Sequence, residues 1–289
     1  MSVSCGLVMV AAWVTAAMFG ARLASGQEAK PAEGKDESQE GVSKRLLVEM
    51  RTLAERMQVA VGDGEKSEEA QLIEKPLYRF NDPARLYSDG SVWAWVTDGR
   101  PVVMTEYHLA NPTKRFWAQD LVAIGDVRIS AELPGNGRWT PRELDFKLLP
   151  VPEISAPAAT DAARLRQMKG FARRLSASEV WEGQRYELRL LPTEVYRYSD
   201  AGSGLVDGAA FVFAFGNNPE TILFVEAHKA DSGPSAPGSW KYGLARMSAA
   251  AVTFRLGDTE VWSVPQTFGS SSTTYYTYTR RFPGADSPD

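Results

Sequence analysis

The spacing of hydrophobic residues predicts one amphipathic helix near the start of each half of the chain. Apolar residues recur every three or four positions from Leu46 to Met57, and again from Leu165 to Leu175, with arginine and glutamate between them. This spacing places the apolar side chains on one face of a helix. We therefore predict that each helix packs its apolar face against the rest of the protein.

Alternating apolar and polar residues after each helix predict antiparallel strands. The predicted strands are Leu72–Phe80, Ser91–Val96, Pro101–Leu109 and Leu121–Glu132, followed by Glu187–Tyr198, Ala209–Phe215, Thr221–His228 and Ala249–Arg255. Asp98-Gly99 and Asn217-Asn218 are typical of hairpin turns. A helix followed by an antiparallel meander predicts an α+β fold, in which each helix lies across a curved sheet.

The two halves also match one another in sequence. At a shift of 118 residues the matches include Met50 with Met168, Arg79 with Arg197, Asp89-Gly90 with Asp207-Gly208, and Trp93-x-Trp95 with Phe211-x-Phe213. Glu106-x-His108 matches Glu226-x-His228 at a shift of 120, and Trp117 and Trp139 match Trp240 and Trp262 at a shift of 123. Matches in one order predict a tandem duplication. The predicted copies span 43–141 and 161–265, and we expect them to share one fold.

The remaining segments are interpreted from their composition. Residues 27–42 are charged and poor in large apolar groups, which predicts a disordered spacer. The proline- and alanine-rich stretch within 142–160 predicts a linker between the copies. Residues 266–289 are rich in serine, threonine, glycine and tyrosine and are predicted to form a flexible tail, although Thr273–Thr279 could add a strand.

Residues 1–26 are typical of a signal peptide. The stretch Gly6–Gly20 is apolar and uncharged, and it is shorter than the ~20 residues that span a bilayer. Ala24-Ser25-Gly26 offers the small residues that a signal peptidase recognises, which places cleavage before Gln27. The alternative is that residues 1–26 are not cleaved and anchor the protein. Only in that case do we expect the protein to associate with a membrane. We therefore expect an exported protein in the periplasm, the cell envelope or the extracellular space.

Cysteine content and charge exclude several classes of function. The only cysteine, Cys5, lies in the predicted signal peptide, so cleavage would leave no thiol nucleophile, disulfide or cysteine metal ligand. The formal net charge of −4 argues against a nucleic-acid partner.

The repeated Glu-x-His pair is the sharpest candidate for chemistry. His108 and His228 are the only histidines, and each follows a glutamate by two residues. Residues two apart in a strand share a face, so each pair presents a carboxylate beside an imidazole. If the halves pack about a twofold axis, Glu106, His108, Glu226 and His228 could converge on zinc or another divalent metal. The alternative is that duplication copied two surface positions without any function.

The other repeated residues are interpreted as structural. Asp82 and Asp89 follow Arg79, as Asp200 and Asp207 follow Arg197, and we expect each arginine to pair with a carboxylate across the loop. The alternative is that two carboxylates seven residues apart bind a cation or act as acid and base. The tryptophans could form a sugar-binding platform. The exchange of Trp93 and Trp95 for Phe211 and Phe213 instead favours core positions.

Several segments carry a resemblance to known proteins. They are Ala163–Lys169, Leu188–Pro192, Tyr196–Tyr198, Asp207–Ala209 and Leu244–Met247. They resemble uncharacterised secreted proteins of planctomycete-type bacteria, over about 43–265. The resemblance implies export and carries no activity or site residue.

The sequence therefore favours an exported, non-enzymatic protein whose α+β body binds a protein or small-molecule partner, with no cofactor. The alternative is a metal-dependent hydrolase that uses zinc or another divalent metal at the Glu-x-His pairs.

Overall fold

The computed structural model describes residues 39–82, 87–111, 116–200, 202–230 and 238–281. The predicted signal peptide 1–26 and most of the spacer 27–42 lie outside the described residues. Helix α1 begins at Gln39, so the spacer prediction is wrong for residues 39–42, which extend the amphipathic helix at its N-terminal end. Within the described ranges, neither helix is long and apolar enough to cross a membrane.

The first half contains one long helix followed by short and long strands. Its elements are α1 (Gln39–Glu55), β1 (Gln58–Val61), a 3-10 turn (Gly64–Lys66), β2 (Glu68–Glu69), β3 (Gln71–Leu72), β4 (Tyr78–Asp82), β5 (Tyr87–Thr97), β6 (Arg100–Asn111), β7 (Phe116–Ala123), β8 (Ile129–Leu133) and β9 (Gly137–Trp139). The β5–β6 turn is formed by Asp98 and Gly99, both with positive φ, as predicted for a tight hairpin.

The second half begins with a short connecting strand and again has a helix before its longer strands. Its elements are β10 (Leu149–Pro150), α2 (Asp161–Ala172), β11 (Leu175–Trp181), β12 (Gln184–Leu190), β13 (Tyr196–Asp200), β14 (Leu205–Phe215), β15 (Asn218–His228), β16 (Ser239–Arg246), β17 (Ala251–Leu256), β18 (Thr259–Val264) and β19 (Tyr275–Arg281). The β14–β15 turn lies at Gly216-Asn217, one residue before the predicted position, because Phe215 pairs with Asn218.

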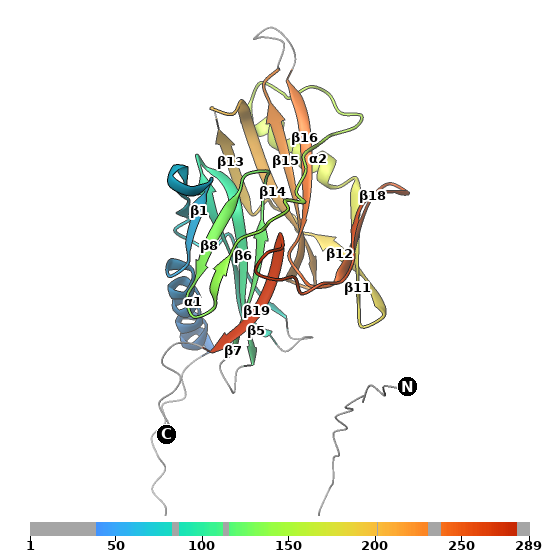
Figure 1. Cartoon of the computed structure of the whole chain (residues 1–289). Coiled ribbons are helices and arrows are strands. Elements are labelled where there is room, and N and C mark those ends of the chain that lie inside the picture. Colours follow the sequence, from blue (N-terminus) through green and yellow to red (C-terminus); the bar gives the residue numbers. More distant parts are fainter. Residues whose placement is uncertain (1–38, 83–86, 112–115, 201, 231–237, 282–289) are drawn as a thin grey trace, which may run out of the picture. The chain divides into compact units, whose positions relative to one another are not determined.

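The strands form antiparallel sheets on which the helices pack (Figure 1). The first sheet has the order β19-β7-β6-β5-β3, with β4 beside β5. The second has the order β10-β16-β15-β14-β12-β11-β17-β18, with β13 beside β14. A smaller sheet has the order β2-β1-β8-β9. The predicted α+β class with antiparallel sheets is thus confirmed at this level.

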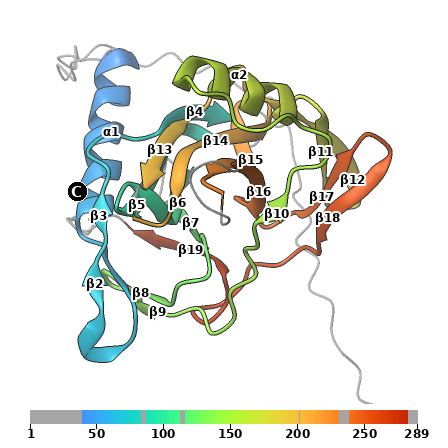
Figure 2. The ribbon, with the colours of Figure 1, turned by 90° about the horizontal axis from the view of Figure 1, so that it is seen from above.

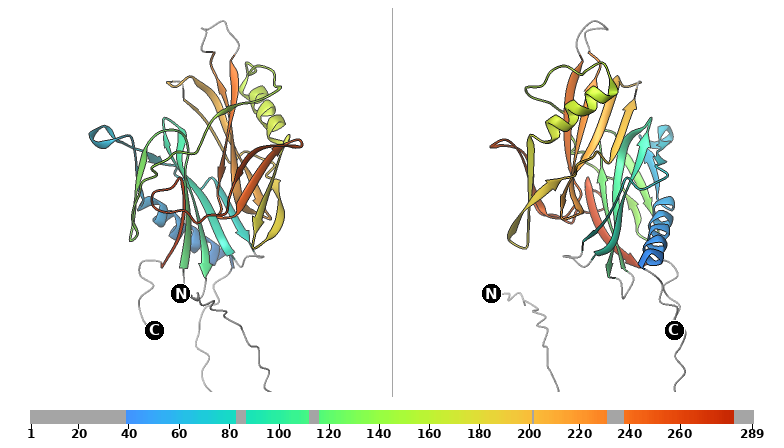
Figure 3. Two further views of the ribbon diagram at one scale, coloured as in Figure 1. Left: turned by 45° about the vertical axis from the view of Figure 1, so that its right-hand side comes forward. Right: turned by 180° about the vertical axis from the view of Figure 1, so that it is seen from behind.

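Three hydrophobic clusters divide the interior into layers. One joins α1 to the first sheet through Met50, Leu53 and Trp93. A second joins α2 to the second sheet through Met168, Phe171 and Phe211. The third contains residues of both sheets and neither helix, so the faces away from the helices pack together. From above, α1 and α2 flank the strands (Figure 2), and from behind each helix lies across the sheet of its own half (Figure 3).

The strand register repeats between the two halves. Tyr78 pairs with Val92 and Tyr196 pairs with Ala210, at a spacing of 118 residues, and the irregularity after Phe80 recurs after Tyr198. The spacing is still 118 on β6 and β15, where Val103 and Thr221 hold matching positions. It becomes 123 on the next strands, where Leu109 pairs with Trp117 and Ala227 pairs with Trp240.

Two glycines mark one shared packing feature. Gly90 lies against the ring of Phe80, and Gly208 lies against the ring of Tyr198. A Cβ atom at either position would collide with that ring. Glycine is therefore required where the aromatic side chain of the neighbouring strand crosses the backbone.

The alternative of a strand at Thr273–Thr279 is confirmed, with bounds shifted by two residues, and the predicted flexible tail 266–289 is wrong for Tyr275–Arg281. These residues form β19, which pairs along its length with β7 and completes the edge of the first sheet, as the red strand beside the green ones shows (Figure 1). Tyr275 is buried, and pairing satisfies backbone groups of β7 that an edge would expose. The predicted linker 142–160 is also packed, because Phe146 is buried between the sheets and β10 pairs with β16.

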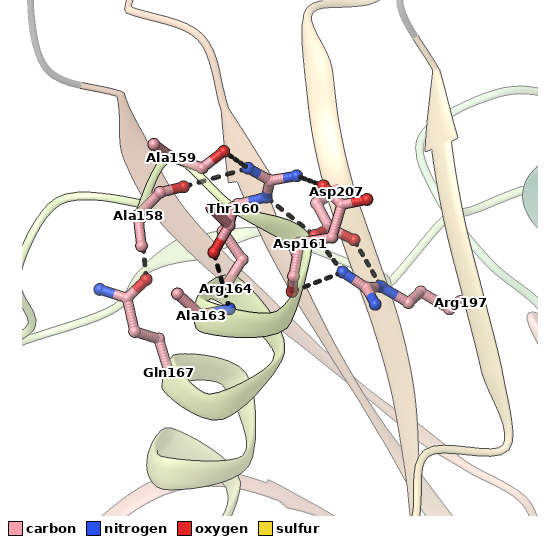
Figure 4. A network of polar contacts seen from close by, with 9 residues as sticks. All are labelled: Ala158, Ala159, Thr160, Asp161, Ala163, Arg164, Gln167, Arg197 and Asp207. Atoms are coloured by element: carbon pink, nitrogen blue, oxygen red, sulfur yellow. Dashed lines mark hydrogen bonds and ion pairs between the residues drawn. The ribbon is translucent and has the colours of Figure 1, made fainter.

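A buried arginine–aspartate network joins α2 to its sheet (Figure 4). Arg197 donates to Asp207 at 2.6 and 2.9 Å, and Arg164 of α2 donates to the same carboxylate at 2.8 Å. Arg164 also pairs with Asp161 in the first turn of the helix. In the first half, Arg79 donates to Asp89 at 2.5 Å, which confirms the predicted pairing in both halves.

Candidate metal centre

Polar side chains replace the apolar inter-sheet core toward the end of β6. Met104 belongs to the core shared by the sheets, and Glu106 and His108 follow on the same face of the strand. Asp120 of β7 pairs directly with Glu106 across the ladder. The alternation of β6 and its register with β7 therefore bring two carboxylates and one imidazole together between the sheets.

The three side chains are close enough to share one ion. His108 Nδ1 lies 3.1 Å from Glu106 Oε1 and 3.8 Å from Asp120 Oδ2. One ligand atom from each residue lies within 4.8 Å of the other two, and all three residues are buried. Ligand atoms around a tetrahedral zinc ion are about 3.3–3.6 Å apart, given bonds of about 2.0–2.2 Å. Small side-chain rotations would therefore bring the three atoms to bonding distance.

The C-terminal strand positions Asp120. Tyr275 Oη donates to Asp120 Oδ1 at 2.5 Å, which leaves Oδ2 toward His108. Burial, the charge of Asp120 and this hydrogen bond raise the pKa of Tyr275 well above its usual value, so the phenol stays a donor. A second group that orients a ligand carboxylate is a common feature of protein metal sites.

A cavity of about 610 Å³ adjoins the three residues. Its lining includes Glu106, His108 and Asp120 from the first half and Asn218 and Glu220 from the second. Asn218 Nδ2 donates to Glu220 Oε1 at 2.7 Å, so the second half adds a further carboxylate that is already oriented. The cavity thus gives a molecule access to a site formed by both halves.

Glu226 and His228 belong to a different polar cluster. The buried Glu226 carboxylate accepts from Tyr198 Oη at 2.9 Å, lies 2.8 Å from His228 Nε2, and pairs with Arg100 at 3.0 Å. Arg100 is the first residue of β6, whereas His108 lies eight residues further along that strand. At ~3.4 Å per residue, about 27 Å of strand separates their backbone positions.

The predicted convergence of the four Glu-x-His residues is therefore wrong. The structure keeps Glu106 and His108 together and adds Asp120, but Arg100 already neutralises Glu226. The two Glu-x-His pairs also occupy different positions along their strands. Glu106 pairs with Val92, and the equivalent position in the second half, opposite Ala210, is occupied by Phe224 rather than by Glu226. His108 corresponds in register to Glu226, and the position that matches Arg100 is held by the uncharged Asn218.

Asp120 and Tyr275 were absent from the predicted site. The signal for Asp120 is a single acidic residue inside an otherwise mostly apolar strand, Phe116–Ala123. A charge on a strand buried on both faces needs a partner or an ion. Tyr275 gave no comparable signal, because its position depends on β19 returning to β7 across more than 150 residues of sequence.

Comparison of the chain with protein-family models, curated proteins and solved structures found no match.

The burial of Asp120 predicts a pH dependence of stability in the metal-free protein. Burial and the neighbouring Glu220 raise the pKa of Asp120, whereas His108, Tyr275 and Thr277 lower it, and the net shift is upward. A carboxyl group with a raised pKa binds its proton more tightly in the folded state, so its ionisation destabilises the fold as pH rises above ~4.

Asp120→Asn removes that ionisation and keeps an oxygen to accept from Tyr275. We expect the free energy of unfolding of the variant, relative to the unsubstituted protein, to increase as pH rises from about 4 toward neutrality. Urea unfolding in the presence of a chelator measures this difference. A relative stability that falls over the same pH range would contradict the raised pKa.

Proposed function

We propose that this protein is an exported, non-enzymatic binding protein whose body holds one divalent metal ion at Glu106, His108 and Asp120. The observation that carries the proposal is the placement of three buried ligand atoms within 4.8 Å of one another beside a cavity. Export rests on the signal-peptide pattern of residues 1–26.

The donor set favours zinc. Imidazole nitrogen suits zinc and the later transition metals, whereas sites for calcium and magnesium use oxygen donors. One nitrogen and two carboxylate oxygens match the ligands that zinc accepts in proteins. Two carboxylates also neutralise the charge of the ion, which favours its binding at a buried position.

Zinc titration of chelator-treated protein by calorimetry tests the proposal. We expect one zinc ion per chain, a higher melting temperature with zinc, and at least a tenfold loss of affinity in His108→Ala, because one of three ligands is removed. His228→Ala is the matched control and should bind zinc as the unsubstituted protein does. The proposal fails if folded protein binds no zinc, or if the two variants lose affinity equally.

We further propose that the two halves arose by tandem duplication. The support is the repeated ladder register, at 118 residues on β4–β6 and β13–β15 and at 123 residues on the strands that follow. On this proposal the site is a later change in one copy. Glu106 and Asp120 are paired across β6 and β7, and the equivalent pair in the second half is Phe224 and Gly243. There the ring of Phe146 lies against Gly243 and occupies the space that the two carboxylates fill in the first half.

A metal-dependent hydrolase is the second candidate. It is favoured by the number of ligands, because three protein ligands leave a coordination position for water, as in catalytic zinc sites. Zinc-loaded protein should then hydrolyse an activated ester or phosphate ester, with activity lost in His108→Ala and kept in His228→Ala. If the protein binds zinc but shows no such activity, the hydrolase candidate fails and only the metal-binding function is supported.

A further inference from the structure

A second cavity, of about 290 Å³, is lined in part by Tyr275, whose hydroxyl donates to Asp120. Its walls are mostly apolar and come from β7, β16, β18 and the segment before β19, with Val122, Leu244, Trp262 and Val264 among them. Its volume is at the small end of the range for ligand sites, ~300–1,000 Å³. The cavity therefore fits a compact molecule rather than a long chain.

One buried cation lines this cavity. Arg246 is 7 % exposed and ends β16. Its Nε donates to the Ser248 carbonyl at 3.1 Å, and its Nη2 donates to the carbonyls of Ala250 and Pro265. Its guanidinium also lies over the ring of Tyr275, 5.1 Å from the ring centre. These contacts fix the plane of the guanidinium.

The remaining nitrogen of Arg246 is available to a ligand. Among the described residues Nη1 makes no hydrogen bond. This atom is also accessible to solvent. The atoms that Arg246 does contact are neutral carbonyls and a neutral phenol. Asp145 is exposed and also lines the cavity, and it acts on Arg246 only through its charge.

We propose that this cavity binds a small monocarboxylic acid with an apolar body, its carboxylate on Arg246 Nη1 and its body against Trp262 and Val264. A charge-assisted hydrogen bond to a desolvated guanidinium is stronger than one between neutral groups. The apolar walls favour a hydrophobic body. The nearby negative charge of Asp145 favours a singly charged anion over a phosphate.

The ligand class can be tested with benzoate and hexanoate as probes, titrated into the purified protein by calorimetry without added metal. We expect saturable binding of one molecule per chain. Benzamide, which lacks the charge, and acetate, which lacks the body, should each bind at least tenfold more weakly. Absence of saturable binding by both acids, or equal affinity for benzoate and benzamide, would overturn the proposal.

Two substitutions locate the site. Arg246→Gln should weaken benzoate binding at least tenfold, because it removes the positive charge. Asp145→Asn should strengthen binding several-fold, because it removes a negative charge beside the carboxylate. Arg246→Gln also loses backbone contacts and can fail to fold, whereas Asp145 is exposed. Unchanged or weaker binding in folded Asp145→Asn would therefore contradict the assignment by itself.

Discussion

Asp207→Ala is expected to lower the free energy of unfolding by about 3–5 kcal/mol. The Asp207 carboxylate accepts from both Arg164 and Arg197, and the side chains of Arg164 and Asp207 are 8 % and 6 % exposed. Removal of the carboxylate leaves two neighbouring guanidinium groups, one of them buried without its principal counter-ion. Breaking a buried ion pair is costly because the remaining charge is still desolvated.

Asp89→Ala is the matched control, because Asp89 holds the corresponding position in the first half. Asp89 pairs with Arg79, whose side chain is 34 % exposed and can be hydrated when its partner is lost. We expect a smaller loss, about 1–2 kcal/mol. Urea unfolding of both variants gives the comparison. Equal losses, or a loss under about 1 kcal/mol for Asp207→Ala, would show that the buried network does not stabilise α2 on its sheet.

Phe211→Ala and Trp93→Ala should each destabilise the protein by about 3–5 kcal/mol. Both rings are 1 % exposed, and each lies in the cluster between the helix and the sheet of its own half. Truncation removes the apolar contacts and leaves a cavity that rigid strands cannot close. The measurement is the free energy of unfolding from urea denaturation.

Phe268→Ala serves as the control for these two substitutions, because that ring is 57 % exposed. Its loss should change stability by less than about 1 kcal/mol. A similarly small effect at Phe211 or Trp93 would place those rings at the surface. It would also favour the sugar-binding platform that the sequence left open.

Local patterns predicted the layers of the fold well. The exchange of Trp93-x-Trp95 for Phe211-x-Phe213 between the halves predicted core positions, and the structure buries all four rings. The pairing of Arg79 and Arg197 with aspartates was predicted from residue type and spacing, and it is confirmed. These features depend on the period of a strand and on opposite charges near in sequence.

Features that depend on distant pairing were not predictable from the sequence. Aligning the two Glu-x-His pairs by sequence requires a shift of 120 residues, which places a two-residue insertion inside the second strand. In the structure, however, the strand pairing keeps equivalent positions 118 residues apart throughout β6 and β15. The length difference lies instead in the connections to β7 and β16. A connection tolerates added residues that would break the hydrogen bonds of a paired strand. The misplaced insertion made Glu226 and His228 look equivalent to Glu106 and His108.

The basic face of α2 shows the same limit. Arg164 belongs to a helix rich in arginine and lysine, and a run of like charges on a helix usually faces solvent or an acidic neighbouring segment. Arg164 is instead buried, because Asp207 lies opposite it on β14. A single sequence does not reveal which arginine of a basic helix meets a buried carboxylate.

The most direct test of the metal site is the anomalous diffraction of a crystal of the protein grown with zinc. We expect one strong peak bonded to His108 Nδ1 and to carboxylate oxygens of Glu106 and Asp120, at about 2.0–2.2 Å. A peak at Glu226 and His228, or a zinc-saturated crystal with no peak between β6 and β7, would contradict this expectation.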